Sequence, residues 1–533
     1  MSELIRQAQS ALNAGNATAA LQASQAAVQA NPNDANAHYL AAAALRMAGR
    51  AGEALRILDF LNQRLPGQPD LINMTGLCRR DMGDAKGAIA DFERVIALNP
   101  AHAPAMGNLA GLLAETEPEK AVPVFEKLAG LHPQSAEPLA LAASVCLRLR
   151  DPERAKAFAA RAVALAPDAM LVRSVEAGIA LAEDDAGRAR ARLETVLPGA
   201  AGPVSQLTVA WGRLAEACDR LKDYPAAFAA CQSANEIQRR DWDIRFAGYD
   251  GPRSLASAER LAQWFDANDP APVDAAQLEG PAPVFQVGFP RSGTTLLEQM
   301  LGAHPDIETL EEQDAIGPVI RGVGDRREQL EKLGALTPDA INAMRRDYWR
   351  QARTEGPPQA GKVFVDKYPM NLAWLGPLMR VFPDAKIIFC LRDPRDCVLS
   401  AFQQRFAVNP EMYRMLKIDE CARLYDTAMR AGQAALASSH AVPVHRLRYE
   451  DLIEDYRGQM TALFGFLGLD WHDDVAGYRE RAAVQTIKTP SAPQVVKPLY
   501  KGAIGKWKNY RFALEPALPA LAHWIERYGY EVS

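Results

Sequence analysis

A glycine-containing loop within residues 287–301, VGFPRSGTTLLEQML, holds the residues whose types and spacing first suggest chemistry. Gly288 and Gly293 stand five positions apart, and Thr294 and Thr295 follow directly. The preceding run, PVFQVGF, is apolar enough for a buried strand, and TTLLEQMLGAH has apolar residues at helical spacing. A loop between a strand and a helix start presents backbone N–H groups and the positive helix end to an anion. The stretch therefore predicts a phosphate-binding loop.

This loop lacks one cation that many phosphate-binding loops carry. In the pattern G-x-x-x-x-G-K-[ST] the lysine reaches the β- and γ-phosphates of a nucleoside triphosphate. Thr294 occupies the lysine position here, and an arginine, Arg291, lies inside the loop instead. The loop therefore favours a nucleotide that has no β,γ-phosphate pair.

A second segment, LRDPRDCVLS, offers cations and a hydroxyl for a separate phosphate. It places Arg392 and Arg395 just after an expected strand, and Ser400 one or two turns into the helix that follows. Guanidinium groups bind phosphate through paired hydrogen bonds. A nucleotide with phosphates at both ends of its ribose is the simplest ligand for both segments.

The second half of the chain repeats this strand–loop–helix pattern. Similar units occupy 362–369, 383–406 and 442–456. Strands that alternate with helices predict an α/β domain with a central parallel sheet covered on both faces. Ligands bind at the carboxyl ends of such strands. Polar residues follow every expected strand, at 291–295, 366–367, 392–395 and 448–451.

The first 240 residues carry an internal repeat. Proline recurs at Pro32, Pro66, Pro100, Pro133 and Pro167, in steps of 33 or 34 residues, and alanine recurs in step at Ala20, Ala54, Ala88, Ala121, Ala155 and Ala189. Each period holds two amphipathic helices that are too short to bury an apolar face alone, so neighbours must stack. A small alanine lets two helices approach closely, and the proline ends the second helix.

The period and these marker positions resemble tetratricopeptide repeats, which implies an α-solenoid with a concave groove that binds a peptide or protein. We expect about six or seven units. The proline-rich stretch APVDAAQLEGPAP leads into the second half. The predicted domains are a repeat array at 1–242, connecting helices at 243–282 and an α/β domain at 283–533.

Composition bounds the partners and the compartment. The net charge of −5 argues against a general nucleic-acid binder. The seven cysteines form no CxxC pair, and an odd number scattered through apolar runs fits reduced thiols. The start of the chain lacks a signal-peptide pattern, and no stretch reaches the length of a membrane span. We therefore expect a cytoplasmic protein without a membrane span, and we also consider a homodimer.

A third segment, YKGAIGKWKNY at 500–510, completes a set with the two phosphate segments. Together the three resemble sulfotransferases that use 3′-phosphoadenosine 5′-phosphosulfate (PAPS) and that have a fold like that of phosphate-loop proteins. In that family the first loop holds the 5′-phosphosulfate, the R-D-P…S segment holds the 3′-phosphate, and G-x-x-G-x-W-K-N contacts the nucleotide. The three segments lie in the family's order over roughly 283–530.

Within that family the tyrosylprotein sulfotransferases are most similar, through LGAHPDIETLEEQDAI, DKYP and SAPQVVKPLYKGAIGKW. The resemblance implies that Glu312 is the general base, that Lys367 and Ser491 stabilise the transferring group, and that Arg291 stabilises the leaving phosphosulfate bridge. It implies a PAPS site at Arg291, Ser292, Gly293, Thr294, Thr295, Arg392, Ser400, Tyr449, Lys497, Lys501, Gly502, Lys506 and Trp507. No metal is expected.

The sequence departs from the tyrosylprotein pattern at two places. The K-D-P site reads Lys-Tyr-Pro, and the arginine expected soon after Ser400 is replaced by Gln403 and Gln404. The acceptor hydroxyl therefore stays open between a tyrosine in a peptide, a glycan, a lipid and a small phenol.

Two alternatives to a sulfotransferase follow from the same residues. One is a repeat scaffold joined to a catalytically degenerate nucleotide-binding domain. The other is a kinase-like enzyme that uses ATP, which the missing loop lysine disfavours.

Overall fold

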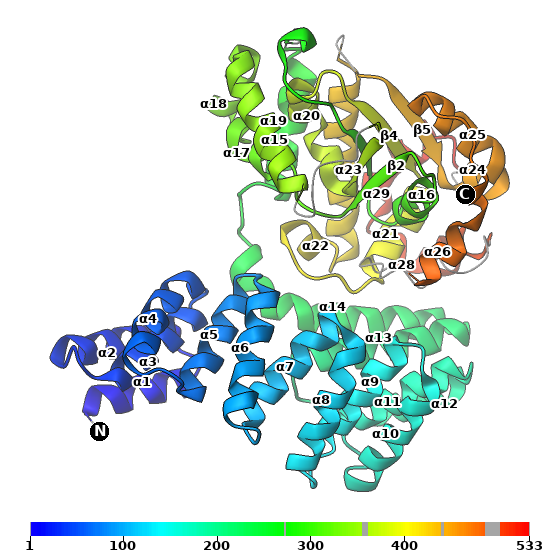
Figure 1. Cartoon of the computed structure of the whole chain (residues 1–533). Helices are drawn as coiled ribbons and strands as arrows, with labels where there is room; N and C mark the ends of the chain where they lie inside the picture. The colour runs from blue at the N-terminus through cyan, green and yellow to red at the C-terminus, as the bar shows by residue number, and fades with distance from the viewer. Residues whose placement is uncertain (1, 271–272, 354–360, 439–441, 485–500, 532–533) are drawn as a thin grey trace. The chain divides into compact units, whose positions relative to one another are not determined.

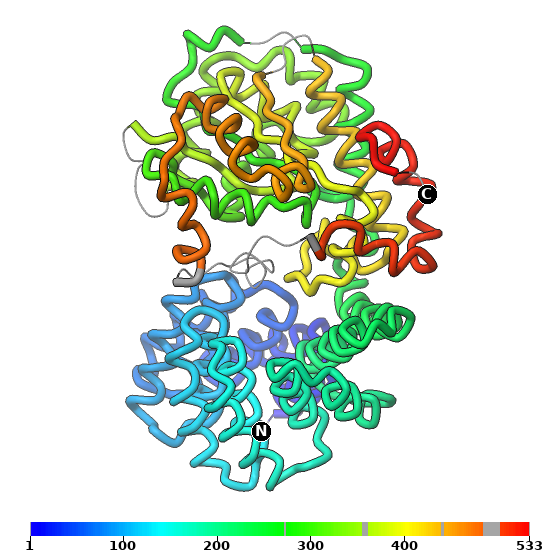
Figure 2. Tube along the Cα trace, turned by 90° about the vertical axis from the view of Figure 1, so that its right-hand side faces the viewer, coloured from blue at the N-terminus to red at the C-terminus, as the bar shows by residue number. Residues whose placement is uncertain are grey.

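Our computed structural model describes residues 2–270, 273–353, 361–438, 442–484 and 501–531. The chain forms two compact units, an N-terminal unit at Met1–Gly202 and a C-terminal unit at Pro203–Ser533. The N-terminal unit consists of helices that pack in antiparallel pairs (Figures 1 and 2). The helices are α1 (Glu3–Asn13), α2 (Ala17–Ala30), α3 (Ala35–Met47), α4 (Ala51–Arg64), α5 (Pro69–Asp81), α6 (Ala85–Leu98), α7 (Ala103–Thr116), α8 (Pro118–Leu131), α9 (Glu137–Arg148), α10 (Pro152–Leu165), α11 (Met170–Ala182) and α12 (Ala186–Glu194).

The marker residues of the repeat lie where the pattern predicts them. All six alanines are completely buried in the second helix of their pair, where a larger side chain would hold the helices apart. The five prolines each follow the residue that caps such a helix, for example Pro32 after Asn31 and Pro100 after Asn99. A proline at that point cannot extend the hydrogen-bond ladder, so the chain turns into the next pair. The predicted helical solenoid is therefore confirmed.

A seventh helix pair, α13 (Val204–Arg220) and α14 (Tyr224–Phe246), belongs to the C-terminal unit. The helix α15 (Leu255–Ala267) follows and packs on α23 (Ile418–Leu436). Packing thus divides the chain at residue 202, whereas the repeat pattern runs on to about residue 242. The domain limits 1–242, 243–282 and 283–533 stay a prediction.

The C-terminal unit contains the predicted parallel sheet. Its strands are β1 (Val284–Gly288), β2 (Ile307–Glu311), β3 (Val363–Lys367), β4 (Lys386–Leu391) and β5 (Val444–Arg448). Every pairing is parallel, and the order is β2-β3-β1-β4-β5. The edge strand β2 was not predicted from the sequence. Only Ile307 and Leu310 of its five residues are buried, so it lacks the apolar run of a central strand.

Helices cover both faces of this sheet (Figure 1). On one face, α16 (Thr294–Gly302) and α25 (Tyr456–Leu467) pack their leucines and methionines against Val284, Val365 and Ile388. On the other face, Phe285 packs against the ring of Tyr348 in α19 (Pro338–Ala352) and against Phe382, the residue that follows α20 (Leu375–Val381). Alternate residues of β1 therefore serve opposite cores.

The remaining elements of the C-terminal unit are short or lie at its edges. These helices are η1 (Ala275–Gln277), α17 (Gly317–Val323), α18 (Arg327–Leu330), η2 (Leu333–Ala335), η3 (Pro369–Trp374), α21 (Pro394–Phe402), α22 (Pro410–Arg414), α24 (Tyr449–Glu454), η4 (Asp473–Gly477), α26 (Tyr478–Val484), η5 (Lys501–Ala503), η6 (Lys506–Tyr510), α28 (Arg511–Leu514) and α29 (Leu518–Arg527). Among the helices that the structure describes, none has the length and apolar character needed to cross a bilayer.

The close packing of helices in the N-terminal unit can be tested by adding a methyl group where two helices touch. Gly76 of α5 faces Phe92 of α6, and a Cβ at position 76 would lie 2.7 Å from the Phe92 ring. Gly76→Ala should therefore destabilise the unit by about 1–3 kcal/mol, since the ring is fully buried and has little room to move. Calorimetric unfolding of the full chain measures this as a lower midpoint for the N-terminal transition.

Gly111 in α7 is the matched control. It is an exposed helix glycine with no atom within 4 Å of its added Cβ. Gly111→Ala should raise the stability by about 0.5–1 kcal/mol because alanine favours the helix. Equal effects of the two substitutions would contradict the packing described here.

Candidate active site

The carboxyl ends of the five strands meet at one edge of the sheet and carry most of the predicted site residues. The loop after β1 turns sharply, with Arg291 at φ 74° and Gly293 at φ 94°, both in the left-handed region. The backbone N–H of Ser292 donates to the carbonyl of Phe289 (3.1 Å) and closes the turn. Gly293 then begins α16, whose first residues Thr294 and Thr295 are buried. This is the geometry of an anion-binding loop.

The structure brings Arg291, Arg392, Ser400 and Tyr449 together. The Nε atom of Arg291 donates to Oγ of Ser400 at 3.0 Å. Arg392, which follows β4, donates to the carbonyl of Arg291 at 2.9 Å and lies 4.9 Å from the centre of the Tyr449 ring. The Tyr449 ring in turn packs on Gly293, where any Cβ would lie 2.6 Å from it. Two segments a hundred residues apart thus form one cationic cluster.

Arg395 has a structural role rather than the phosphate-binding role that the sequence suggested. Its guanidinium makes two hydrogen bonds to Asp393, at 3.0 and 2.7 Å, and stacks 3.6 Å from the centre of the Trp507 ring. Trp507 is buried. Its backbone N–H and that of Gly505 donate to Asp396 of α21, which ties the 505–507 turn to the helix that carries Ser400.

A cavity of about 400 Å³ opens over this cluster. Its lining includes five predicted residues, which are Arg291, Arg392, Ser400, Gly502 and Lys506. Gln403 and Gln404, which replace the arginine of the family pattern, also line it. The other lining residues were not predicted from the sequence, and they are Asp219, Tyr224, Asp396, Leu399, Ala503 and Asn509. Trp507 is not among the described residues that line it.

At the same edge of the sheet, Lys367 at the end of β3 lies between two carboxylates. Its Nζ is 2.9 Å from Oε1 of Glu312 and 3.0 Å from Oε2 of Glu298. Lys367 and Glu298 are 0% and 1% exposed, whereas the Glu312 side chain is 38% exposed. The predicted pair of base and lysine is therefore in contact, and its base is open to solvent on one side.

The backbone at Glu312 is held in an unusual conformation. Glu312 has φ 42°, which a residue with a Cβ rarely adopts, and its N–H donates to the carbonyl of Lys367 at 2.9 Å. Because the β2–β3 pairing continues one residue past the strand, the Glu312 carboxylate is brought to the lysine. Strain of this kind persists where surrounding structure fixes it.

Burial and charge set the protonation of this trio. Burial raises the pKa of Glu298 to about 7, against the opposing effect of Lys367. Burial lowers the pKa of Lys367, but Glu298 and Glu312 outweigh it and leave that pKa above the ordinary lysine value. The ammonium group therefore stays charged. Glu298 was not predicted from the sequence, although a single acidic residue amid the apolar positions of α16 was a signal for it.

Three predicted residues fall outside what the structure describes. Ser491 and Lys497 lie outside the described residues, and so does the side chain of Lys501, whose backbone begins η5. Their proposed roles stay predictions. Within the described ranges, no group of three or more His, Cys, Asp or Glu side chains is arranged to hold a metal ion.

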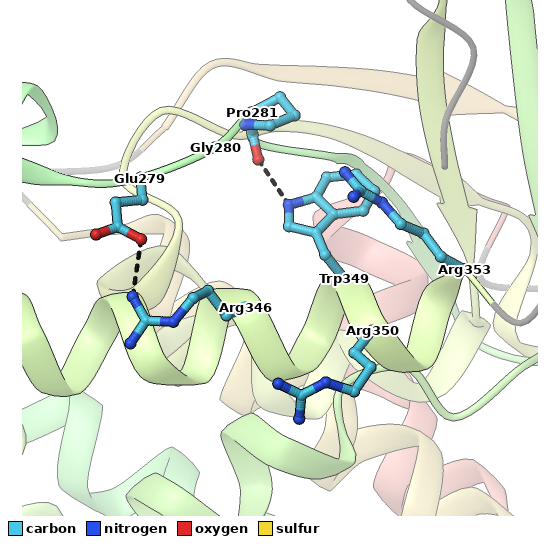
Figure 3. A pocket seen from close by; sticks show the side chains of 7 residues that line it. All are labelled: Glu279, Gly280, Pro281, Arg346, Trp349, Arg350 and Arg353. Atoms are coloured by element: carbon cyan, nitrogen blue, oxygen red, sulfur yellow. Dashed lines mark hydrogen bonds and ion pairs between the residues drawn. The ribbon is translucent and has the colours of Figure 1, made fainter. Parts of the chain in front are cut away.

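A second cavity, of about 590 Å³, lies beside the segment that leads into β1 (Figure 3). Its lining residues are Glu279, Gly280, Pro281, Arg346, Trp349, Arg350 and Arg353. Trp349 donates to the carbonyl of Pro281 at 3.0 Å, and Arg346 pairs with Glu279. This cavity lies toward the amino ends of the strands and contains none of the predicted site residues.

Two parts of the chain match known protein families. Residues 283–473 match the Sulfotransferase family, and residues 5–69 and 74–136 match the Tetratricopeptide repeat. The chain joins tetratricopeptide repeats to a sulfotransferase-family domain. The sulfotransferase match spans β1 to β5 and so includes the loop, Glu312, Lys367 and Arg392.

Two relatives and one solved structure illustrate the similarity. An uncharacterized protein of Aquifex aeolicus (strain VF5) is 26% identical over 389 residues, which cover 70% of this chain and 49% of that protein. Protein-tyrosine sulfotransferase 1 of Danio rerio is 28% identical over 262 residues, 46% of this chain and 72% of that protein. A tetratricopeptide repeat protein from Parabacteroides merdae matches 44% of this chain and 92% of its own at 17% identity, with a TM-score of 0.37.

Asp366, which precedes Lys367 in β3, should make the stability of the fold depend on pH. It is fully buried and accepts a hydrogen bond from Tyr348 at 2.9 Å, and burial raises its pKa to about 7. The folded state therefore holds a proton that the unfolded chain loses near its ordinary pKa of 3.8. Stability from this group is present at low pH and falls between about pH 4 and 7, by at most about 1.4 kcal/mol per pH unit.

Asp366→Asn should remove that pH dependence, because the amide stays neutral and still accepts from Tyr348. Urea midpoints of variant and parent should be similar near pH 4 and should diverge toward pH 7, with the variant more stable. Asp347→Asn, an exposed change on α19, controls for loss of a surface charge. A constant difference between Asp366→Asn and the parent across this range would contradict the assignment.

Proposed function

We propose that this protein transfers a sulfuryl group from PAPS to the hydroxyl of an acceptor. The observation that carries the proposal is the contact between Glu312 and Lys367, at the same sheet edge as the cluster of Arg291, Arg392 and Ser400. Both lie in the region that matches the sulfotransferase family. The cluster supplies cations for a dianionic nucleotide. The pair supplies a base and a cation for transfer.

The residues around the 400 Å³ cavity fit a nucleotide with a phosphate at each end of its ribose. Its lining carries three cationic side chains, Arg291, Arg392 and Lys506, and the Nε atom of Arg392 is buried without a hydrogen-bond partner among the described residues. Buried donors of this kind are costly unless something satisfies them. We assign donor binding to Arg291, the 292–295 loop, Arg392, Ser400, Tyr449, Gly502 and Lys506, and to Ser491, Lys497 and Lys501 on the family pattern.

When bound, PAPS supplies an activated sulfuryl group with a phosphate as its leaving group. The partly exposed carboxylate of Glu312 takes the proton from the acceptor hydroxyl, as general bases do for about 10²–10⁴-fold in rate. Lys367 keeps its charge between two carboxylates and so can lower the cost of negative charge that builds nearby. Glu298 holds Lys367 in place from the buried side.

For the acceptor we favour a tyrosine in a peptide or protein. The relative from Danio rerio is named a protein-tyrosine sulfotransferase, and its match covers 46% of this chain. A glycan, a lipid or a small phenol are the other acceptors to test, since Lys-Tyr-Pro departs from the tyrosylprotein pattern.

A repeat scaffold with a degenerate nucleotide domain is the alternative. A lysine buried completely with two carboxylates costs several kcal/mol in desolvation, and such arrangements cluster at functional sites. This observation favours catalysis over a relic site. Thr294 at the loop's lysine position argues in the same way against an ATP-dependent kinase.

Two variants of the full chain separate binding from transfer. Arg392→Ala should weaken adenosine 3′,5′-bisphosphate by about 10-fold or more, since it removes a charged hydrogen-bond donor. Glu312→Gln should bind the bisphosphate normally and lose about 10²–10⁴-fold in transfer. Calorimetric titration and labelled PAPS with a panel of tyrosine peptides and phenols provide the two measurements.

Titration with ATP is the matched control for donor specificity. Equal affinity for ATP and the bisphosphate would overturn the donor assignment. Selective bisphosphate binding without transfer to any acceptor in the panel would favour the scaffold.

We further propose that the protein is cytoplasmic, as its seven buried thiols suggest.

We also propose that the repeat array recruits the acceptor or a partner protein through its groove. Removal of residues 1–202 keeps α13 and α14 in place. It should raise KM for a protein acceptor at least about tenfold by lowering its local concentration, and it should leave bisphosphate affinity unchanged. Unchanged acceptor kinetics would contradict recruitment. Sedimentation of the full chain tests for a homodimer.

A further inference from the structure

The helix pair α13–α14 is built into the part of the C-terminal unit that carries Ser400. Asn235 of α14 donates to the carbonyl of Phe402 at 2.9 Å, at the end of α21. Phe228 stacks on Phe402 with ring centres 4.9 Å apart. Arg405 donates to the carbonyl of Val209 in α13 at 3.2 Å. The pair therefore forms a fixed support for α21 rather than a separate hairpin.

Asp219, near the end of α13, contacts the family's nucleotide segment directly. Its carboxylate lies 3.0 Å from Nζ of Lys506, and it also accepts from the hydroxyl of Tyr510. Asp396 holds the same segment from the other side through the N–H groups of Gly505 and Trp507. Lys506 is thus fixed by a residue that lies 287 positions earlier in the chain.

The same helix pair reaches the donor cavity. Asp219 and Tyr224 line it together with Arg291, Arg392 and Ser400. The ring of Tyr224 packs edge-on against Tyr510 at 5.2 Å, so α13–α14 contacts the nucleotide segment through both Asp219 and Tyr224.

From these contacts, we propose that α13–α14 forms one wall of the donor site and that Asp219 is the positioning residue that directs Lys506 toward the 3′-phosphate end of the nucleotide. The proposal rests on the proposed function. The donor site then includes α13–α14 of the C-terminal unit, which lie outside the residues 283–473 that match the sulfotransferase family.

The carboxylate of Asp219 has two opposite effects on an anionic ligand, because its charge repels the anion while its contact with Lys506 positions a cation for it. The carboxylate already pairs with the ammonium group of Lys506, and the pair is close to neutral as a unit. Its loss would leave Lys506 cationic but unrestrained, since a lysine side chain has many rotamers. Positioning should therefore outweigh repulsion.

Titration of the full chain with two nucleotides tests this inference. Asp219→Ala should weaken adenosine 3′,5′-bisphosphate by about tenfold, because one charged hydrogen bond that orients Lys506 is lost. Binding of adenosine 5′-monophosphate, which lacks the 3′-phosphate, should change little. A merely structural defect would weaken both nucleotides alike.

A double-mutant cycle checks that Asp219 acts through Lys506. Asp219→Ala combined with Lys506→Ala should bind the bisphosphate no more weakly than Lys506→Ala alone. Asp219→Asn, which keeps an oxygen acceptor, should show a smaller loss and serves if Asp219→Ala folds poorly. Gln232→Ala, an exposed change on α14, should bind like the parent.

The outcomes distinguish this inference from the proposed function. A parent chain that does not prefer the bisphosphate to the monophosphate removes the donor assignment itself. If the parent does prefer the bisphosphate, two results overturn the inference alone. One is that Asp219→Ala binds the bisphosphate as well as or better than the parent. The other is that the losses in affinity from Asp219→Ala and Lys506→Ala add in the double mutant.

Discussion

A buried ammonium group between two carboxylates is the interaction around which the C-terminal unit is arranged. Lys367 has no exposure to solvent, so its charge is tolerable only while Glu298 and Glu312 remain within about 3 Å. Those three residues come from β3, α16 and the end of β2. The parallel order of the sheet is what brings them to one edge, since the carboxyl ends of parallel strands must lie side by side.

The two carboxylates around Lys367 differ in exposure, and this difference gives them different capacities. Glu298 is enclosed by the core under α16 and can only hold the lysine. Glu312 lies at a strained backbone position at the rim, where its other oxygen can meet a second molecule. One lysine thus links a buried carboxylate to a carboxylate that solvent reaches, and Arg291 and Arg392 lie at the same edge of the sheet.

The repeats contribute in two physically different ways. Helices α1 to α12 form a unit of their own, stabilised by buried alanines that let the pairs stack closely. The last pair, α13–α14, shares its hydrogen bonds and rings with α21 and with the segment at Lys506. This helix pair thus forms part of the wall around the cavity of about 400 Å³.

The sequence by itself determined the features that local patterns encode. The 34-residue period and its alanines, the glycine loop before α16, and four of the five strands could be predicted because each depends on residues close together in the chain. Arg291, Ser400, Glu312 and Lys367 could be selected through family motifs. Tertiary structure alone decided that Arg395 stacks on Trp507, that Glu298 joins Lys367, and that Asp219 reaches Lys506. The physical reason is that these contacts join segments whose separation in sequence carries no periodic or local signal, so only the packing of helices on the sheet brings them within bonding distance.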